Sequence, residues 1–135
     1  NLCLSGCRER EGTGVNPFAF CDLPSGNGSL SFLLIGNSYA ANIGPIVQQH
    51  FTQNYSTFHS WAIPSCEPFF LTSTFGFCVD PITAQRQFNS ALETVKPDVL
   101  FIMARYLDLD TPIDGAIDND FIFTEIMRRM KYFET

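Results

Sequence analysis

The fold of this chain is decided by residues 29–41, which read Ser-Leu-Ser-Phe-Leu-Leu-Ile-Gly-Asn-Ser-Tyr-Ala-Ala. An apolar, strand-like run ends at Gly36, and the missing side chain of this glycine permits a tight turn. Ser38 follows, and a helix-compatible segment begins there. Ligands and reacting groups collect at the carboxyl ends of strands in open α/β sheets. The stretch therefore predicts a strand-to-helix turn that presents Ser38 as a candidate nucleophile.

The length and the charge limit the classes of protein to which the chain can belong. Its 135 residues correspond to one domain, or part of one, with a real hydrophobic core. The formal net charge of -6 argues against nucleic acid as a partner and offers no attraction to anionic membranes. No apolar run approaches the roughly 18 residues of a membrane span, and no secretory signal is visible. Because the chain opens on Asn1 and not on methionine, we expect it to be a piece of a longer protein.

Cysteines and glycosylation sequons together point to an oxidising, luminal or extracellular setting. The sequons begin at Asn27 and Asn54. The cysteines are Cys3, Cys7, Cys21, Cys66 and Cys78. Their odd number leaves one free thiol, or one partner outside this sequence. Zinc binding by the first three is not expected, because structural zinc takes four ligands with tighter spacing. Pairing of Cys21 with Cys3 or Cys7 is the preferred interpretation.

The chain divides into a glycine- and proline-rich segment, residues 1–28, and an alternating α/β segment, residues 29–135. The first segment is interpreted as a loop or linker held by cysteines. Strands are expected over 29–35, 57–63 and 98–104, and helices over 44–51, 81–95 and 120–133. The first helix is placed at residue 44 because Pro45 is tolerated in a first turn and not in a helix interior. This alternation predicts a parallel sheet with helices on its faces, and the few strands indicate that the sheet is incomplete.

Helical spacing also predicts which side chains of the later helices are buried. In the helix over 81–95 they are Ile82, Gln85, Phe88, Asn89 and Leu92. In the helix over 120–133 they are Phe121, Ile122, Ile126, Met127 and Met130. The basic last turn of this final helix suits the negative end of the helix dipole.

A serine nucleophile needs a base, and the base needs a carboxylate to orient it. The only histidines in this sequence are His50 and His59. His50 follows Ser38 by about 12 residues, which at ~1.5 Å per residue places it at the far end of the helix. His59 lies near the start of the second strand, away from that strand's carboxyl end. Both are expected to be structural or surface residues, and for Ser38 itself helix capping is the simpler alternative.

Residues 35–42, Ile-Gly-Asn-Ser-Tyr-Ala-Ala-Asn, resemble the first block of SGNH (GDSL-like) hydrolases, in the version fused to acyltransferase-3 membrane proteins. The resemblance extends through Pro-Ser-Cys-Glu-Pro at 64–68 and through Lys-Pro-Asp-Val at 96–99 to Ala-Arg-Tyr at 104–106. It implies a three-layer α/β/α, flavodoxin-like fold with a parallel sheet. It also implies a serine esterase or O-acyltransferase without metal or cofactor, in which Ser38 attacks an acyl ester and its N–H group serves the oxyanion hole.

The sequence departs from the family pattern at three places. The family's Asp-x-x-His motif, which supplies the base, does not occur, and we expect the chain to stop before it. Where the family often has an oxyanion-hole asparagine, the chain has Ala104, Arg105 and Tyr106. Arg105 and Tyr106 become oxyanion-hole candidates, with packing or pairing to an acidic loop as the alternative. Gly76 is the nearest candidate for the second-block glycine, or it is a turn residue.

Two further features lie around the expected site. Cys66 and Cys78 enclose a short loop beside it, so we expect a disulfide there, with two buried thiols as the alternative. An acidic loop contains Asp108, Asp110, Asp114, Asp118 and Asp120. It does not follow the EF-hand pattern, because Pro112 occupies the fifth position, and it is interpreted as a solvated loop. Neither Asp110 nor Asp118 is expected to be the triad acid, which the family places beside the missing histidine.

The resulting hypothesis is a Cys/Gly/Pro-rich linker at 1–28, followed at 29–135 by the N-terminal part of an SGNH-type domain. The domain is expected to be the luminal or extracellular part of a multi-pass membrane protein, with membrane contact only through the parent chain. Its expected partners are an acyl donor and a hydroxyl acceptor, on glycans or lipids. A free-standing secreted esterase and a non-catalytic glycan- or acyl-binding domain are the alternatives. Without its base, this chain alone is expected to be inactive.

Overall fold

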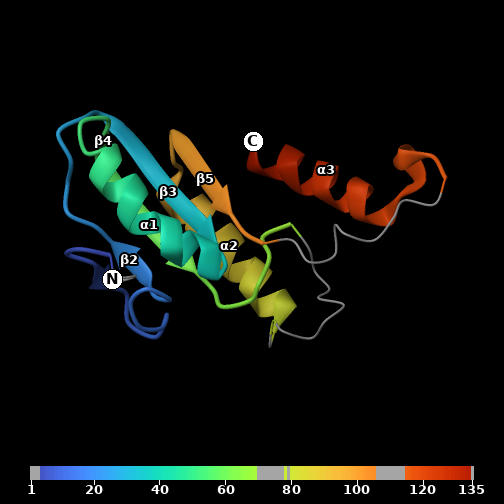
Figure 1. Cartoon of the computed structure of the whole chain (residues 1–135), viewed down its shortest axis with the longest axis horizontal. Coiled ribbons are helices and arrows are strands. Elements are labelled where there is room, and N and C mark those ends of the chain that lie inside the picture. The colour runs from blue at the N-terminus through green and yellow to red at the C-terminus, as the bar shows by residue number, and fades with distance from the viewer. Residues whose placement is uncertain (1–3, 70–77, 79, 106–114, 135) are drawn as a thin grey trace.

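The computed structural model describes residues 4–69, 78, 80–105 and 115–134 (Figure 1). Its strands are β1 (Arg8–Glu9), β2 (Phe20–Asp22), β3 (Leu30–Gly36), β4 (Tyr55–Ala62) and β5 (Val99–Met103). Its α-helices are α1 (Ser38–His50), α2 (Pro81–Val95) and α3 (Phe121–Phe133), and a short 3-10 turn, η2 (Ile117–Asn119), precedes α3. The strands form one sheet with the order β1-β2-β4-β3-β5.

The sheet is mixed, whereas the sequence predicted a parallel sheet. β3 pairs in parallel with β4 on one side and with β5 on the other, while β2 pairs antiparallel with β4 and β1 antiparallel with β2. The three parallel strands lie in the order β4-β3-β5, so the second of them in the sequence is followed by the first and then the third. The flavodoxin-like strand order 2-1-3-4-5 starts in the same way. At the carboxyl end of β3, Gly36 lies opposite both Ala62 and Met103. All three parallel strands therefore end at the same edge.

The sheet is covered by a helix on each face, so the expected α/β/α layering is present. Phe32 and Leu34 of β3 pack in one cluster with Ala40, Ala41 and Val47 of α1. Leu33 and Ile35, the alternate residues of the same strand, pack in a second cluster with Ala84, Phe88 and Ala91 of α2. This alternation follows from the period of two along a strand, and because both faces are covered the strand is continuously apolar from Phe32 to Ile35.

The first helix begins earlier than the sequence predicted. It starts at Ser38, not near residue 44, and Pro45 lies inside it. An interior proline removes one backbone hydrogen bond and costs about 3 kcal/mol. Burial of the helix face against β3 and β4 offsets this cost, and Gly44 allows α1 to approach the Leu4 and Leu34 side chains closely. Packing therefore overrides the local preference.

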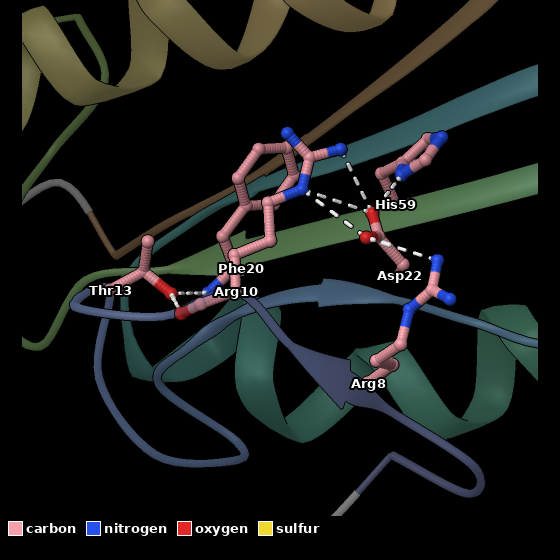
Figure 2. Close-up of polar contacts among 6 residues, drawn as sticks. All are labelled: Arg8, Arg10, Thr13, Phe20, Asp22 and His59. Carbon is pink, nitrogen blue, oxygen red and sulfur yellow. Dashed lines mark hydrogen bonds and ion pairs between the residues drawn. The ribbon is translucent and has the colours of Figure 1, made fainter.

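The N-terminal segment also differs from the loop predicted for residues 1–28. Its β1 and β2 extend the sheet beyond β4, and Leu4 and Cys21 are buried in the core. A disulfide joins Cys7 to Cys21, with the Cα atoms 5.1 Å apart, so of the two expected partners of Cys21 it is Cys7 that pairs. Figure 2 shows Asp22 of β2 between arginine side chains and His59 of β4.

The remaining predicted elements agree with the structure to within a few residues, and the disulfide between Cys66 and Cys78 is confirmed. Two predicted helix faces need correction. In α2 the buried residues are Ala84, Gln85, Phe88 and Ala91, while Ile82 is exposed. In α3 the side chains of Phe121, Met127 and Met130 are exposed. The buried residue of α3 is Arg129, which is 2% exposed.

Candidate functional site

The site is built around Ser38, the first residue of α1. The central strand β3 ends at Gly36, and Asn37 forms the N-cap between strand and helix. Because the core anchors both β3 and α1, the turn between them is fixed in space. Ser38 is exposed at this edge of the sheet, as the sequence predicted, and is not enclosed in apolar packing.

Gly36 permits the close approach of β3 and β5 that forms this edge. Its φ of 153° lies outside the range that L side chains readily adopt. A Cβ atom at this position would overlap the Met103 carbonyl oxygen and would touch the Ala40 side chain at 3.0 Å. Glycine is thus required here by backbone conformation and by space. The requirement explains the glycine that ends the strand in the sequence.

Asn37 links the serine turn to the end of β5. Its side chain is 4% exposed, and its Oδ1 accepts hydrogen bonds from the Tyr39 N–H at 3.1 Å and the Arg105 N–H at 3.3 Å. Its Nδ2 donates to the Arg105 carbonyl oxygen at 3.2 Å. One amide therefore caps α1 and holds the chain after β5 beside Ser38. The two segments are 68 residues apart in the sequence.

The start of α1 favours negative charge near Ser38. The first N–H groups of a helix have no partner within the helix, and the macrodipole adds a partial positive charge at this end. The N–H groups of Tyr39, Ala40 and Ala41 bond to Asn37. Within the described part of the chain, no hydrogen bond engages the N–H or the Oγ of Ser38. This arrangement could stabilise an oxyanion that forms on a group attacked by Ser38.

Neither histidine lies near Ser38. His50 is the last residue of α1, at the opposite end of the helix. His59 lies in the middle of β4, opposite Leu33, about 10 Å from the end of the strand at ~3.3 Å per residue. Its Nδ1 is 2.8 Å from the Asp22 Oδ1 (Figure 2). The structure thus gives His59 a partner within the sheet and supplies no histidine base to the serine.

The electrostatics around His59 are those of a packed ion cluster. Arg10 donates to Asp22 from Nη2 at 2.9 Å and stacks over the Phe20 ring at 4.0 Å, while Arg8 is 3.7 Å from the same carboxylate. Burial raises the pKa of Asp22, but hydrogen bonds and charges from Arg10 and His59 lower the pKa more, so that it lies below its usual range. The cluster fastens β1 and β2 to β4.

The other predicted site residues have different outcomes. The backbone of Arg105 is hydrogen-bonded to the Asn37 side chain, and Arg105 is exposed. A role for Arg105 in the oxyanion hole stays a prediction. Gly76 and Tyr106 lie outside the described residues, as do Asp108, Asp110 and Asp114 of the acidic loop. Asp118 lies in η2, and Asp120 caps α3 by accepting from the Phe123 N–H at 2.8 Å. Where the structure is described, no group of three His, Cys, Asp or Glu residues could hold a metal ion.

Two residues that the sequence analysis did not single out have clear roles. Asn37 could have been recognised as an N-cap, because asparagine is favoured immediately before a helix. Arg129 had no such signal, since it lies in a basic run. It donates to the Pro68 carbonyl oxygen at 3.3 Å and to the Asn89 Oδ1 at 2.7 Å, and burial lowers its pKa. Arg129 thereby connects α3 to α2 and to the loop that the Cys66–Cys78 disulfide encloses.

In this α/β domain an exposed serine lies at a helix N-terminus, directly beyond the central parallel strand. A family model described as "SGNH domain (fused to AT3 domains)" matches residues 6–131. The chain therefore belongs to this SGNH family, an esterase and acyltransferase family. The match includes β1 and β2, which precede the region of resemblance seen in the sequence.

The other comparisons give no further relative, because no curated protein and no solved structure matches the chain. Among the helices that the structure describes, none combines the length and apolar character needed to cross a membrane. The domain type suggests an extracytoplasmic part of a membrane protein, and the two disulfides agree with an oxidising setting.

Proposed function

We propose that this chain carries the nucleophile of a serine esterase or O-acyltransferase domain, and that Ser38 accepts an acyl group from an ester of a glycan or lipid. The observation that carries the proposal is the exposed Ser38 at the start of α1. Membership of the SGNH family supports the reaction class.

In the proposed reaction the Ser38 Oγ attacks the acyl carbonyl carbon while its proton passes to a base. The carbonyl oxygen becomes an oxyanion, which the Ser38 N–H group and the positive end of α1 stabilise. Removing one oxyanion-hole donor typically costs about 2.7–4 kcal/mol. The oxyanion then reforms the carbonyl, the bond to the leaving oxygen breaks, and the protonated base gives its proton to that oxygen. The acyl group stays on Ser38 until water or a sugar hydroxyl, deprotonated by the same base, takes it. Asn37 holds the turn in place throughout these steps.

The base of this reaction is not His50 or His59, because both lie far from Ser38 along their elements. We infer that the base is contributed by residues of the parent protein outside this sequence. The 135-residue chain by itself should therefore show no turnover of p-nitrophenyl acetate. Robust turnover that Ser38→Ala abolishes would contradict this inference and show that the chain contains its own base.

The central test uses the full-length parent protein and a fluorophosphonate probe, which labels activated serines. Labelling and acyl transfer are expected in the wild type and in Ser25→Ala, an exposed-serine control in the N-terminal segment, and both should disappear in Ser38→Ala. A labelled peptide containing residue 38 would support the proposal. Full labelling and transfer in Ser38→Ala would refute it.

A second candidate function is binding of a glycan or acyl ligand without turnover. The absence of a histidine near Ser38 within this chain is the observation that favours it. The two functions differ in the same experiment. A binding domain would retain its ligand in the parent protein, would not be labelled at Ser38, and would bind equally well after Ser38→Ala.

A further inference from the structure

The two sequons of the chain meet at one corner of the folded domain. Asn27 lies shortly before β3, which begins at Leu30, and Asn54 immediately precedes β4. Both residues are exposed. The Asn27 N–H donates to the Thr52 carbonyl oxygen at 2.8 Å, and the Leu30 N–H donates to the Asn54 carbonyl oxygen at 3.2 Å. Segments that are distant in the sequence are thus hydrogen-bonded to each other at the sequons.

The middle residue of the first sequon packs directly on the second sequon. The Gly28 N–H donates to the Tyr55 carbonyl oxygen at 2.9 Å. A Cβ atom at Gly28 would overlap the backbone of Asn54, so only glycine fits between the two asparagines. The exposed asparagines therefore flank a tight backbone junction, and groups attached to them would leave the domain at the same place.

This corner lies at the end of the sheet opposite to Ser38. β3 and β4 are parallel and both begin here, whereas Ser38 follows the carboxyl end of β3. In Figure 1 the corner is the end of β3 and β4 away from the arrowheads, and α1 begins beside the arrowhead of β3. A bulky group at the corner would be separated from Ser38 by the length of the strand, about 20 Å for a strand of this size.

We propose that Asn27 and Asn54 both carry N-linked glycans, which together cover this corner and leave the Ser38 edge open. In the transfer, the asparagine Nδ2 forms a bond to the anomeric carbon of an oligosaccharide carried on a lipid pyrophosphate. The bond between that carbon and the pyrophosphate oxygen breaks, the lipid pyrophosphate leaves, and the amide proton passes to a base of the transferase. The disulfides place the chain in the oxidising setting where this modification occurs.

The modification of Asn54 has to occur before β4 is complete. In the folded domain the middle residue of this sequon, Tyr55, is buried, and the Ser56 Oγ donates to the Leu30 carbonyl oxygen at 3.3 Å. A folded strand cannot enter the site of a transferase that needs a free, extended segment. Occupancy must therefore be measured on protein made in secretory eukaryotic cells.

The test compares the full-length protein with variants before and after treatment with peptide N-glycosidase F, by gel mobility and peptide mass. Two glycans are expected in the wild type and one each in Asn27→Gln and Asn54→Gln. Ser29→Ala and Ser56→Ala should each remove the corresponding glycan while keeping the asparagine. Asn42→Gln, an exposed asparagine of α1 outside any sequon, should leave both glycans in place.

An unmodified Asn27 or Asn54 in the wild type would overturn the proposal, as would a glycan that survives Ser29→Ala or Ser56→Ala. Occupancy is read without any acyl substrate. Its failure is therefore distinguishable from failure of the proposed serine chemistry.

Discussion

The tightest steric constraint at the site is at Gly36, and the substitution Gly36→Ala tests it. The new methyl carbon would overlap the Met103 carbonyl oxygen, at a distance well below the 3.0 Å that Cβ atoms keep from other heavy atoms. Neither atom can move alone, because the Met103 carbonyl belongs to β5 and Gly36 belongs to β3. We therefore expect the carboxyl ends of the two strands to separate, which would also weaken the bonds between Asn37 and Arg105.

The expected magnitude has two parts. A side chain in an unfavourable backbone region costs about 1–3 kcal/mol. Forcing an extra carbon into a packed contact costs about another 1–3 kcal/mol. Together they lower the free energy of unfolding by about 2–6 kcal/mol, a large part of the 5–15 kcal/mol that is typical of a domain. Gly12→Ala is the matched control, because Gly12 has a φ of 75° and no neighbour within 4 Å. It should cost only about 1–2 kcal/mol.

Urea unfolding of the purified protein measures both variants. Trp61 is the single tryptophan of this chain and stacks on Phe20 with the ring centroids 4.9 Å apart, so its fluorescence reports on the sheet. The fluorophosphonate labelling of Ser38 in the parent protein should fall in Gly36→Ala and not in Gly12→Ala. Equal losses of stability in the two variants would refute the steric argument. Both substitutions put a side chain in an unfavourable backbone conformation, but only Gly36→Ala also creates an overlap.

Three further predictions concern other contacts. Asn37→Ala should lower the free energy of unfolding by about 2–4 kcal/mol, from the loss of three partly buried hydrogen bonds, and should reduce acyl transfer. Asp98→Ala is the control: it removes the side-chain hydrogen bond from the Ser31 N–H to Asp98 at the opposite end of β3 and should leave acyl transfer unchanged. Equal losses of acyl transfer in Asn37→Ala and Asp98→Ala would contradict a positioning role for Asn37. Because the pKa of Asp22 is lowered in the folded state, its ionised carboxylate adds to the free energy of unfolding above the unfolded pKa of about 3.9, and this stabilisation is lost as the pH falls through the folded value. The difference in the free energy of unfolding between the wild type and Asp22→Asn should therefore narrow below about pH 4. A difference that does not change with pH would contradict this. Loss of the second disulfide in Cys66→Ser should cost about 3 kcal/mol in urea unfolding without reductant, and an unchanged midpoint would contradict the chain-entropy account.

Local signals were enough to predict the elements whose ends are marked by the chain itself. The helix over 81–95 was predicted at its observed bounds, since Pro81 suits the first turn. The structure adds that Asp80 caps this helix by accepting from the Thr83 N–H. The strand β5 was predicted from a continuous apolar run after Pro97. The exposed Ser38 beyond β3 was predicted for the same reason, because the apolar run and Gly36 are adjacent in the sequence.

Elements that depend on distant partners were not predicted. β1 and β2 have only 2 and 3 residues, too few for a pattern, and they are held by the Cys7–Cys21 disulfide and by contacts to His59. The inward face of α3 was assigned to apolar side chains. The structure instead buries Arg129, whose partners Pro68 and Asn89 are 61 and 40 residues away. Hydrophobic periodicity carries no information about such polar contacts.

The same distinction explains which features of the candidate site were predicted from the sequence and which became known only from the structure. Ser38 needs only the strand before it and the helix after it, so a short motif identifies it. What holds Ser38 in place is a contact between chain segments: the amide of Asn37 bonds both backbone groups of Arg105, and Gly36 admits the end of β5. An asparagine can serve both bonds because it donates from Nδ2 and accepts at Oδ1, whereas an ionised aspartate could not donate to the Arg105 carbonyl oxygen. The amide at position 37 is therefore matched to the backbone it meets, and this match becomes visible only when β5 lies beside β3.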